Sequence, residues 1–213
     1  MIADEPIDLE LTKREEIFRG RVWDVRRDEV NYFGVPMVRD YVVHPGAVGV
    51  IAINDKADLL LVSQYRHPMG KNMWEPPAGL LDTVEESPLV AAKRELLEET
   101  GYEATTWNVL VDFANSPGGS TEQIRCYLAQ GLKEHASGRP MGNDEELHML
   151  VEWVPLESVI AGIRTGLVTN SLLVAGTFAL LTSLADPEML RDADASWPAR
   201  DFAISADRVR LPE

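Results

Sequence analysis

The chain has 213 residues, a hydrophobic content of 45% and a formal net charge of −15 at pH 7. This length suits one domain of moderate size, and the hydrophobic fraction suffices for a packed core. The negative charge argues against nucleic-acid binding through a basic surface, although metal ions or a few arginines can still hold an anionic substrate. The single cysteine, Cys126, excludes a disulfide framework, and its apolar-alternating neighbours predict a buried strand residue.

The N-terminal part favours extended structure. Its acidic start lacks a basic stretch followed by an apolar run, so we expect no signal peptide and a cytoplasmic protein. Alternating β-formers then predict strands at Phe18–Val25, Val30–Tyr32 and Val35–Val43. We expect residues 1–45 to form an N-terminal β-sheet region that precedes a main domain over residues 46–190.

Apolar strands and three helices are expected in the main domain. The continuous apolar run Gly46–Ile53 predicts a buried strand that forms a hairpin with Leu59–Tyr65. Later elements of this domain are strands at Thr105–Phe113, Gln123–Gln130 and Met149–Val154 and a helix at Leu156–Thr165. The stretch Leu167–Leu184 contains too many polar residues for a membrane span and predicts a buried helix, capped by Asn170 or Thr169.

The last residues are polar and punctuated by prolines. We expect residues 191–213 to form a C-terminal tail that either clasps a neighbouring chain or remains mobile.

The segment from Gly79 to Tyr102 carries the strongest signal for a helix. Ser87 suits the N-cap, Pro88 suits the first helical position, and Gly101 can adopt the left-handed conformation that ends a helix. The expected helix covers Pro88–Thr100. We expect its buried face to carry Leu89, Val90, Leu96 and Leu97.

Three carboxylates lie on the other face of this helix. Glu95, Glu98 and Glu99 have the spacing i, i+3 and i+4, which brings like charges together. A hard divalent cation such as Mg²⁺ or Mn²⁺ turns that repulsion into binding. The alternative for three glutamates alone is a solvated acidic face.

The same segment resembles the Nudix box. The second half of that pattern matches at Arg94, Glu95, Leu96, Glu98, Glu99, Gly101 and Tyr102. Its first glutamate falls on Glu86, and Gly79 precedes this residue with one residue more than the pattern has. We interpret the difference as a longer loop; the alternative is that Glu85 replaces Glu86 with a bulge further on.

Most of the chain resembles the ADP-ribose pyrophosphatase branch of the Nudix superfamily, and its actinobacterial members in particular. The similar runs are 63–82, 115–129, 143–156 and 165–180. The resemblance implies an α+β Nudix fold, in which a mixed sheet lies between helices and a small N-terminal antiparallel sheet precedes it. It also implies a homodimer in which the N-terminal sheets exchange.

The resemblance implies roles for the residues around the box. Glu95, Glu98 and Glu99 would hold Mg²⁺ or Mn²⁺ together with the backbone carbonyl of Ala78, and Glu98 would also take part in catalysis. Gly79 would allow the backbone to approach a metal ion or phosphate. Arg94 would orient the acids through a bidentate pair with Glu86. A later acidic turn supplies the general base, which is Glu146 or its neighbour Glu145.

Substrate contacts are expected from residues outside the box. Arg39 and Arg66 match phosphate-binding arginines of the branch, although each could equally be a surface cation. Ser116 and Gly118, in a tight turn, and Glu122 match residues near the terminal ribose. The aromatic partner of the adenine stays open among Tyr32, Phe33 and Trp74.

The sequence therefore predicts a metal-dependent enzyme that cleaves ADP-ribose to AMP and ribose 5-phosphate, with a small-molecule partner and neither nucleic acid nor membrane. One alternative is the same chemistry on another nucleoside diphosphate sugar, such as GDP-mannose. A second is a non-catalytic sensor of nucleotide sugars, which the intact box glutamates disfavour.

Overall fold

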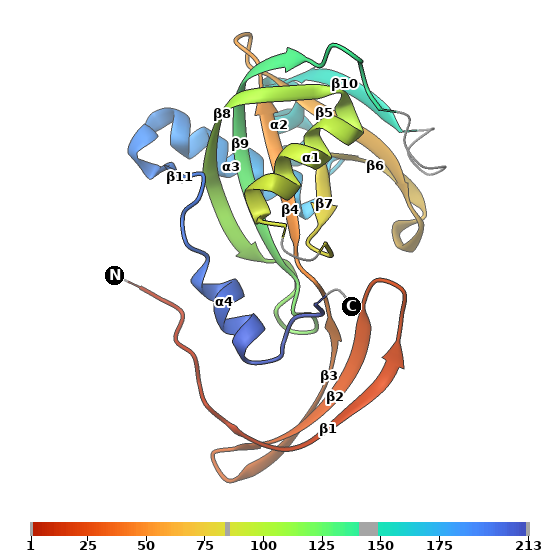
Figure 1. Cartoon of the computed structure of the whole chain (residues 1–213), viewed down its shortest axis with the longest axis vertical. Helices are drawn as coiled ribbons and strands as arrows, with labels where there is room; N and C mark the ends of the chain where they lie inside the picture. Colours follow the sequence, from red (N-terminus) through yellow and green to blue (C-terminus); the bar gives the residue numbers. More distant parts are fainter. Residues whose placement is uncertain (1, 84–85, 141–148, 212–213) are drawn as a thin grey trace.

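Two sheets organise the protein, and helices cover both faces of the larger one (Figure 1). The computed structural model describes residues 2–83, 86–140 and 149–211. A three-stranded antiparallel sheet lies beside the end of the larger sheet, to which β3 connects it directly (Figure 1). The predicted α+β class with a small N-terminal sheet is confirmed.

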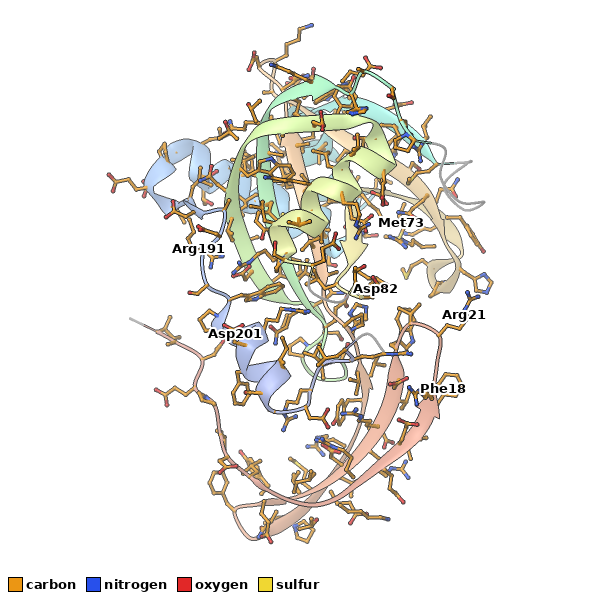
Figure 2. The ribbon with its side chains drawn as sticks, in the orientation of Figure 1. Phe18, Arg21, Met73, Asp82, Arg191 and Asp201 are labelled. Atoms are coloured by element: carbon orange, nitrogen blue, oxygen red, sulfur yellow. The ribbon has the colours of Figure 1, made fainter. Side chains whose placement is uncertain are left out.

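The N-terminal sheet consists of β1 (Glu10–Arg19), β2 (Asp24–Tyr32) and β3 (Val35–Val43). The predicted strand over Phe18–Val25 is wrong, because Gly20 N–H donates to the Trp23 carbonyl oxygen at 3.2 Å and closes a turn there. Phe18, near the end of β1, projects into solvent (Figure 2). Strand β1 is rich in charged residues and mostly exposed to solvent. Its sequence therefore lacks the alternation of apolar and polar residues by which a half-buried strand is recognised.

The larger sheet is mixed because β4 and β9 run parallel while its other neighbours pair antiparallel. Its order is β10-β5-β4-β9-β8-β11, with β6 paired to β5 and β7 paired to β4. The strands are β4 (Ala47–Ile53), β5 (Asp58–Arg66), β6 (Lys71–Glu75), β7 (Ala78–Leu80), β8 (Tyr102–Ala114), β9 (Gln123–Glu134), β10 (Leu150–Pro155) and β11 (Arg191–Asp192). A short 3-10 turn, η1 (His67–Met69), joins β5 to β6.

Strand β4 is buried on both faces, as its continuous apolar sequence predicts. Val48 and Val50 contact the cluster that includes α1 (Pro88–Thr100). Ile51 and Ile53 face the opposite cluster, formed with α2 (Leu156–Arg164) and α3 (Ser171–Ala185). The alternating side chains of one strand therefore serve two cores.

Helix α1 begins and ends where the sequence predicts, but its buried face is rotated. Ser87 Oγ accepts the Val90 N–H at 3.3 Å, and Gly101 has φ 79°. Val90, expected to be buried, is 54% exposed, whereas Glu99 is only 7% exposed. The reason is that Glu99 lies one turn from Leu96, so these two residues share a face of the helix.

Helix α3 packs through small residues onto its own sheet. The Asn170 side chain caps it by accepting the Leu173 N–H at 2.8 Å. A Cβ at Gly176 would lie 2.7 Å from Ile51 Cδ1 and 3.2 Å from Cys126 Sγ. Cys126 is fully buried, as predicted, and burial raises the pKa of its thiol to about 12. Within the described ranges, no helix combines the length and apolar character needed to cross a membrane.

The C-terminal tail packs on its own chain, which corrects the expectation that it clasps a neighbour or stays mobile. It contains β11 and α4 (Pro198–Ser205), and η3 (Pro187–Met189) precedes it. Trp197 is 5% exposed and lies 4.7 Å from the buried Arg125 guanidinium. Arg125 also donates to the Ala195 and Ser196 carbonyl oxygens at 2.6 and 2.9 Å, so strand β9 anchors the tail.

Gly176→Val tests the close packing of α3. The added side chain must displace Ile51 or Cys126, so we expect the free energy of unfolding to fall by about 1–3 kcal/mol. Urea denaturation measures the change. Ala175→Val is the matched control on the same helix, and an equal loss in both variants would contradict the packing account.

Candidate functional site

Arg94 holds three carboxylates of the predicted site at one guanidinium. Its Nε and Nη2 donate to the two oxygens of Glu86 at 2.9 and 3.0 Å, which is the expected bidentate pair. Its Nη1 donates to Glu95 at 2.7 Å and to Glu98 at 2.9 Å. The Arg94 guanidinium holds the pKa of Glu86 below its usual range. One cation therefore offsets much of the repulsion that the helix spacing creates.

Strand β7 positions the other side of the cluster. The buried Glu99 carboxylate accepts the backbone N–H of Ala78 at 3.0 Å. Gly79 follows, and a Cβ at this position would overlap the Glu95 carboxyl group. Since β7 pairs with β4 across Gly79 and Val48, the sheet fixes the backbone that both glutamates face. Glycine is required here by side-chain packing, in addition to the close approach that the sequence predicts.

The donor chemistry of this cluster fits a hard divalent ion. Carboxylate oxygens on α1 and a backbone segment at Ala78 and Gly79 are ligands that Mg²⁺ and Mn²⁺ accept. Among the described residues, however, no three acidic, histidine or cysteine side chains are arranged around one metal position. These carboxylates accept hydrogen bonds from the protein itself. Glu95 and Glu98 accept from Arg94, and Glu99 accepts from the backbone N–H of Ala78.

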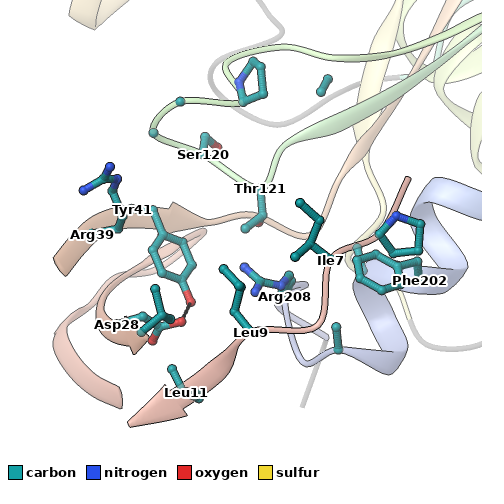
Figure 3. Close-up of a pocket in the computed structure, with 18 of the residues that line it drawn as sticks. Ile7, Leu9, Leu11, Asp28, Arg39, Tyr41, Ser120, Thr121, Phe202 and Arg208 are labelled. Atoms are coloured by element: carbon teal, nitrogen blue, oxygen red, sulfur yellow. Dashed lines mark hydrogen bonds between the residues drawn. The ribbon is translucent and has the colours of Figure 1, made fainter. Parts of the chain in front are cut away.

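A pocket of about 870 Å³ lies between the N-terminal sheet, the turn before β9 and the tail (Figure 3). It brings together three of the predicted substrate residues, namely Arg39, Gly118 and Glu122. The carboxylate cluster does not line this pocket. The predicted metal ligands and the predicted substrate residues of the pocket therefore lie at separate places in the structure.

Two predicted substrate residues lie outside the pocket. Arg66 donates to the buried Glu75 through Nε at 2.9 Å and Nη2 at 2.6 Å. The Ser116 carbonyl oxygen accepts the N–H groups of Gly119 and Ser120 at 3.0 and 2.9 Å, so Ser116 shapes the turn that presents Gly118. The predicted general bases, Glu145 and Glu146, lie outside the described residues.

His44, which the sequence reading left unassigned, lies beside Glu122, a residue of the pocket wall. Its Nδ1 accepts the Gly46 N–H at 3.0 Å, and its Nε2 lies 3.8 Å from Glu122 Oε1. Its ring stacks on Trp23, with 5.8 Å between centroids. Gly46 is a local partner of His44, whereas Trp23 and Glu122 come from distant positions that no local spacing signals. The chain position of His44 after an apolar strand was the only available hint.

Comparisons with known proteins agree on one family. The model of the NUDIX domain matches residues 43–169. A protein of Mycobacterium tuberculosis called ADP-ribose pyrophosphatase is 40% identical over 95% of this chain and 97% of its own length. A Bacillus subtilis protein of the same name is 37% identical over 64% of this chain and 74% of its own.

A solved structure shares the fold as well. The crystal structure of an ADP compounds hydrolase superposes with a TM-score of 0.70 at 20% identity, and covers 97% of this chain and all of that one. The resemblance inferred from residues 79–102 and from the longer runs is confirmed by these matches.

His44 predicts a pH dependence of stability. Burial lowers its pKa below the ordinary value of 6.5, and Arg200 adds to this while Glu122 opposes it. The unfolded chain takes up a proton near pH 6.5 that the folded protein resists. The stability from His44 is therefore complete above pH 6.5 and is lost as the pH falls below it.

We expect His44→Gln to flatten the change in unfolding free energy between pH 8 and about pH 5. Denaturation in urea at a series of pH values measures it, with His135→Gln as the control. An unchanged acid slope in His44→Gln would contradict the assignment.

Proposed function

Since the chain belongs to the family of proteins with a NUDIX domain, we propose that it hydrolyses the pyrophosphate bond of ADP-ribose to release AMP and ribose 5-phosphate. The observation that carries this proposal is the similarity to the mycobacterial relative over nearly the whole chain. That similarity extends beyond the NUDIX match into the N-terminal sheet and the tail, which together form the pocket.

The metal site belongs to the same proposal. Glu95, Glu98, Glu99 and the Ala78 carbonyl would hold Mg²⁺ or Mn²⁺, with Glu98 placed to act in catalysis as well. The ion would neutralise charge on the diphosphate and make a bound water more acidic. The support is the oxygen-rich donor set beside Gly79, where the carboxylates of α1 meet the backbone of β7.

Other residues of the chain would position the metal ligands and the substrate. Arg94 fixes the α1 carboxylates through Glu86, so that their positions do not depend on flexible side chains alone. Arg66, held by Glu75, offers a cation beside β6 for a phosphate oxygen. Arg39, Gly118 and Glu122 would contact the substrate group in the pocket, and Ser116 would shape that wall.

A glutamate after the box would act on the water. The water oxygen attacks one phosphorus, the bond from that phosphorus to the bridging oxygen breaks, and the proton passes to the glutamate. We assign this role to Glu146, with Glu145 as its neighbour in the sequence.

A homodimer and a cytoplasmic location complete the proposal. Exposed apolar side chains on the N-terminal sheet, including Ile17, Phe18, Val35 and Val38, support an exchange with a second copy. The single cysteine, Cys126, is buried, which suits a reducing compartment. Sedimentation as a monomer at micromolar concentration would exclude the dimer.

The substrate and the metal site are tested together by turnover. We expect AMP release from ADP-ribose with Mg²⁺, at a higher kcat/KM than nucleotide release from GDP-mannose. Glu99→Gln should lower kcat by about 100-fold or more, because it removes a carboxylate ligand from the ion that stabilises the transition state. Glu103→Gln, an exposed glutamate on β8, is the matched control. Full activity of Glu99→Gln would overturn the metal assignment.

The general base is tested by comparing two adjacent variants. Glu146→Gln should lower kcat by about 100-fold with little change in KM, while Glu145→Gln should have a much smaller effect. The pH dependence of kcat in each variant shows whether a proton acceptor has been lost. Equal losses in the two variants would contradict the choice of Glu146.

A further inference from the structure

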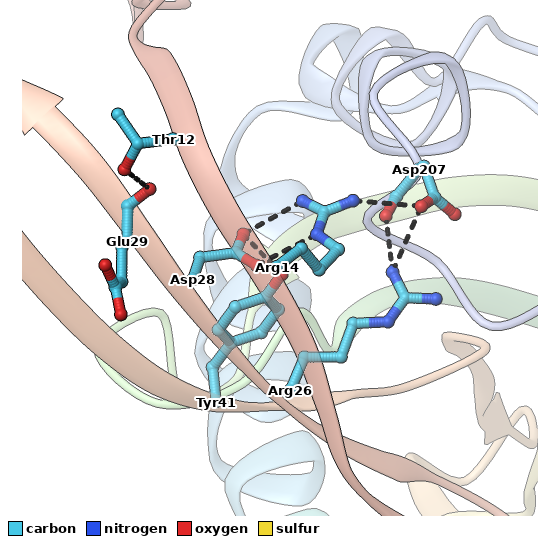
Figure 4. Close-up of polar contacts among 7 residues, drawn as sticks. All are labelled: Thr12, Arg14, Arg26, Asp28, Glu29, Tyr41 and Asp207. Carbon is cyan, nitrogen blue, oxygen red and sulfur yellow. Dashed lines mark hydrogen bonds and ion pairs between the residues drawn. The ribbon is translucent and has the colours of Figure 1, made fainter.

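The two carboxylates that β2 and β3 supply to the pocket are both paired. The two oxygens of Asp28 accept hydrogen bonds from Arg14 at 2.9 Å, and the Tyr41 hydroxyl donates to the same carboxylate at 2.9 Å (Figure 4). The two oxygens of Asp40 accept hydrogen bonds from Arg27 at 2.7 and 2.9 Å. A ligand hydroxyl would therefore have to compete with a charged partner at either residue.

Glu122, on the turn before β9, keeps one oxygen for another partner. Its Oε2 accepts a side-chain N–H of Asn115 at 2.7 Å, which orients the carboxylate. In the part of the chain that the structure describes, no hydrogen bond reaches its Oε1. Asp8, the remaining carboxylate of the pocket, lies on the exposed N-terminal arm. Glu122 is thus the held carboxylate of the pocket that can still accept a ligand hydroxyl.

A buried imidazole lies beside this free oxygen. His44 is 6% exposed, and its Nε2 lies 3.8 Å from Glu122 Oε1. Its Nδ1 accepts the Gly46 N–H at 3.0 Å, so the neutral ring carries its proton on Nε2, the nitrogen next to Glu122. The separation of 3.8 Å exceeds a hydrogen bond, so Oε1 stays available while the ring is neutral.

Backbone contacts join His44 to the same turn as Glu122. The His44 N–H donates to Thr121 Oγ1 at 3.0 Å. Two residues earlier, the Val42 N–H donates to the Gly119 carbonyl oxygen at 2.9 Å, and the Val42 carbonyl oxygen accepts the Thr121 N–H at 2.9 Å. His44 therefore cannot move away from Glu122 unless the end of β3 separates from the turn.

Burial and two charged groups determine the protonation of His44. Burial lowers the pKa of the ring below 6.5, Glu122 opposes this, and Arg200 on α4 adds to it. Arg200 is held nearby, because its Nη1 donates to the Pro45 carbonyl oxygen at 2.6 Å. A protonated ring would draw Glu122 Oε1 into an ion pair and would turn a second N–H towards Gly46. Protonation would therefore withdraw the free oxygen from the pocket.

We propose that Glu122 Oε1 accepts a hydroxyl of the terminal sugar of the substrate and that His44 is the residue that positions this oxygen. This inference rests on the proposed function and deepens it, because it assigns the group that recognises the sugar and the group that holds it in place. A hydroxyl bonds strongly to a carboxylate, since the acceptor is charged. His44 acts through Glu122 and is not among the residues that line the pocket.

Two substitutions separate the two nitrogens of His44. Glutamine can place an amide N–H near the Nε2 position, whereas asparagine can place its amide oxygen near the Nδ1 position and reaches no further. Calorimetry in EDTA, with ADP-ribose and with ADP, gives the preference for the ligand that carries the terminal ribose. We expect Glu122→Gln and His44→Asn to lower this preference by about fivefold or more, and His44→Gln to keep it within about twofold of the wild type.

Stability separates this positioning role from a purely structural one. His44→Gln lacks the acceptor of the Gly46 N–H, so it should unfold at lower urea than His44→Asn although it keeps the ligand preference. His135→Asn is the matched control, because His135 Nδ1 likewise accepts the N–H two residues on, from Ser137 at 3.3 Å. It should leave the preference unchanged. A preference that follows stability, with a larger loss in His44→Gln than in His44→Asn, would overturn the positioning role.

The pH dependence of the preference is the second readout. Between pH 8 and about pH 5 the preference of the wild type should fall relative to that of His44→Gln, which has no imidazole to protonate. Parallel profiles for the two proteins would contradict the role of His44.

AMP release from ADP-ribose with Mg²⁺ distinguishes this inference from the proposed function. A wild type that shows the His44-dependent preference but releases no AMP would overturn the proposed function alone. A wild type that releases AMP, while His44→Asn and Glu122→Gln keep the full preference, would overturn this inference alone.

Discussion

The site depends on the neutralisation of its own carboxylates by Arg94. In a chain with a net charge of −15, three glutamates on one helix would repel each other unless a cation lay between them. Arg94 contacts Glu86, Glu95 and Glu98 at 2.7 to 3.0 Å and so offsets part of this repulsion. The same bonds keep the acids preorganised, which is what binding of a divalent ion requires.

A second set of ion pairs joins the parts of the chain that lie outside the NUDIX match. Asp207 in the tail binds Arg14 and Arg26 of the N-terminal sheet, while Arg125 and Trp197 attach the tail to the body. The pocket is a consequence of these contacts, because its walls come from all three segments. The carboxylate cluster and the walls of the pocket are therefore supplied by different parts of the structure. Under the proposed function, this separation allows substrate specificity to change while the chemistry is retained.

Local signals predicted the site helix well, since the caps at Ser87 and Gly101 and the Arg94–Glu86 pair depend on short spacings. Non-local features escaped prediction. Strand β1 is exposed and carries no alternation. Val90 was expected on the buried face of its helix but is exposed to solvent. Asp207 and His44 owe their positions to tertiary contacts between segments far apart in the chain, which no sequence period encodes.

The central claim is that Glu95, Glu98 and Glu99, two of which Arg94 contacts, become ligands of a divalent ion. Calorimetric titration with Mn²⁺ of the wild type, Glu99→Gln and Glu103→Gln tests it most directly. The account predicts that the wild type and Glu103→Gln bind Mn²⁺ with the same affinity. The affinity of Glu99→Gln for Mn²⁺ should be lower by about tenfold or more. Identical titrations for all three proteins, or no heat of Mn²⁺ binding in any of them, would contradict it.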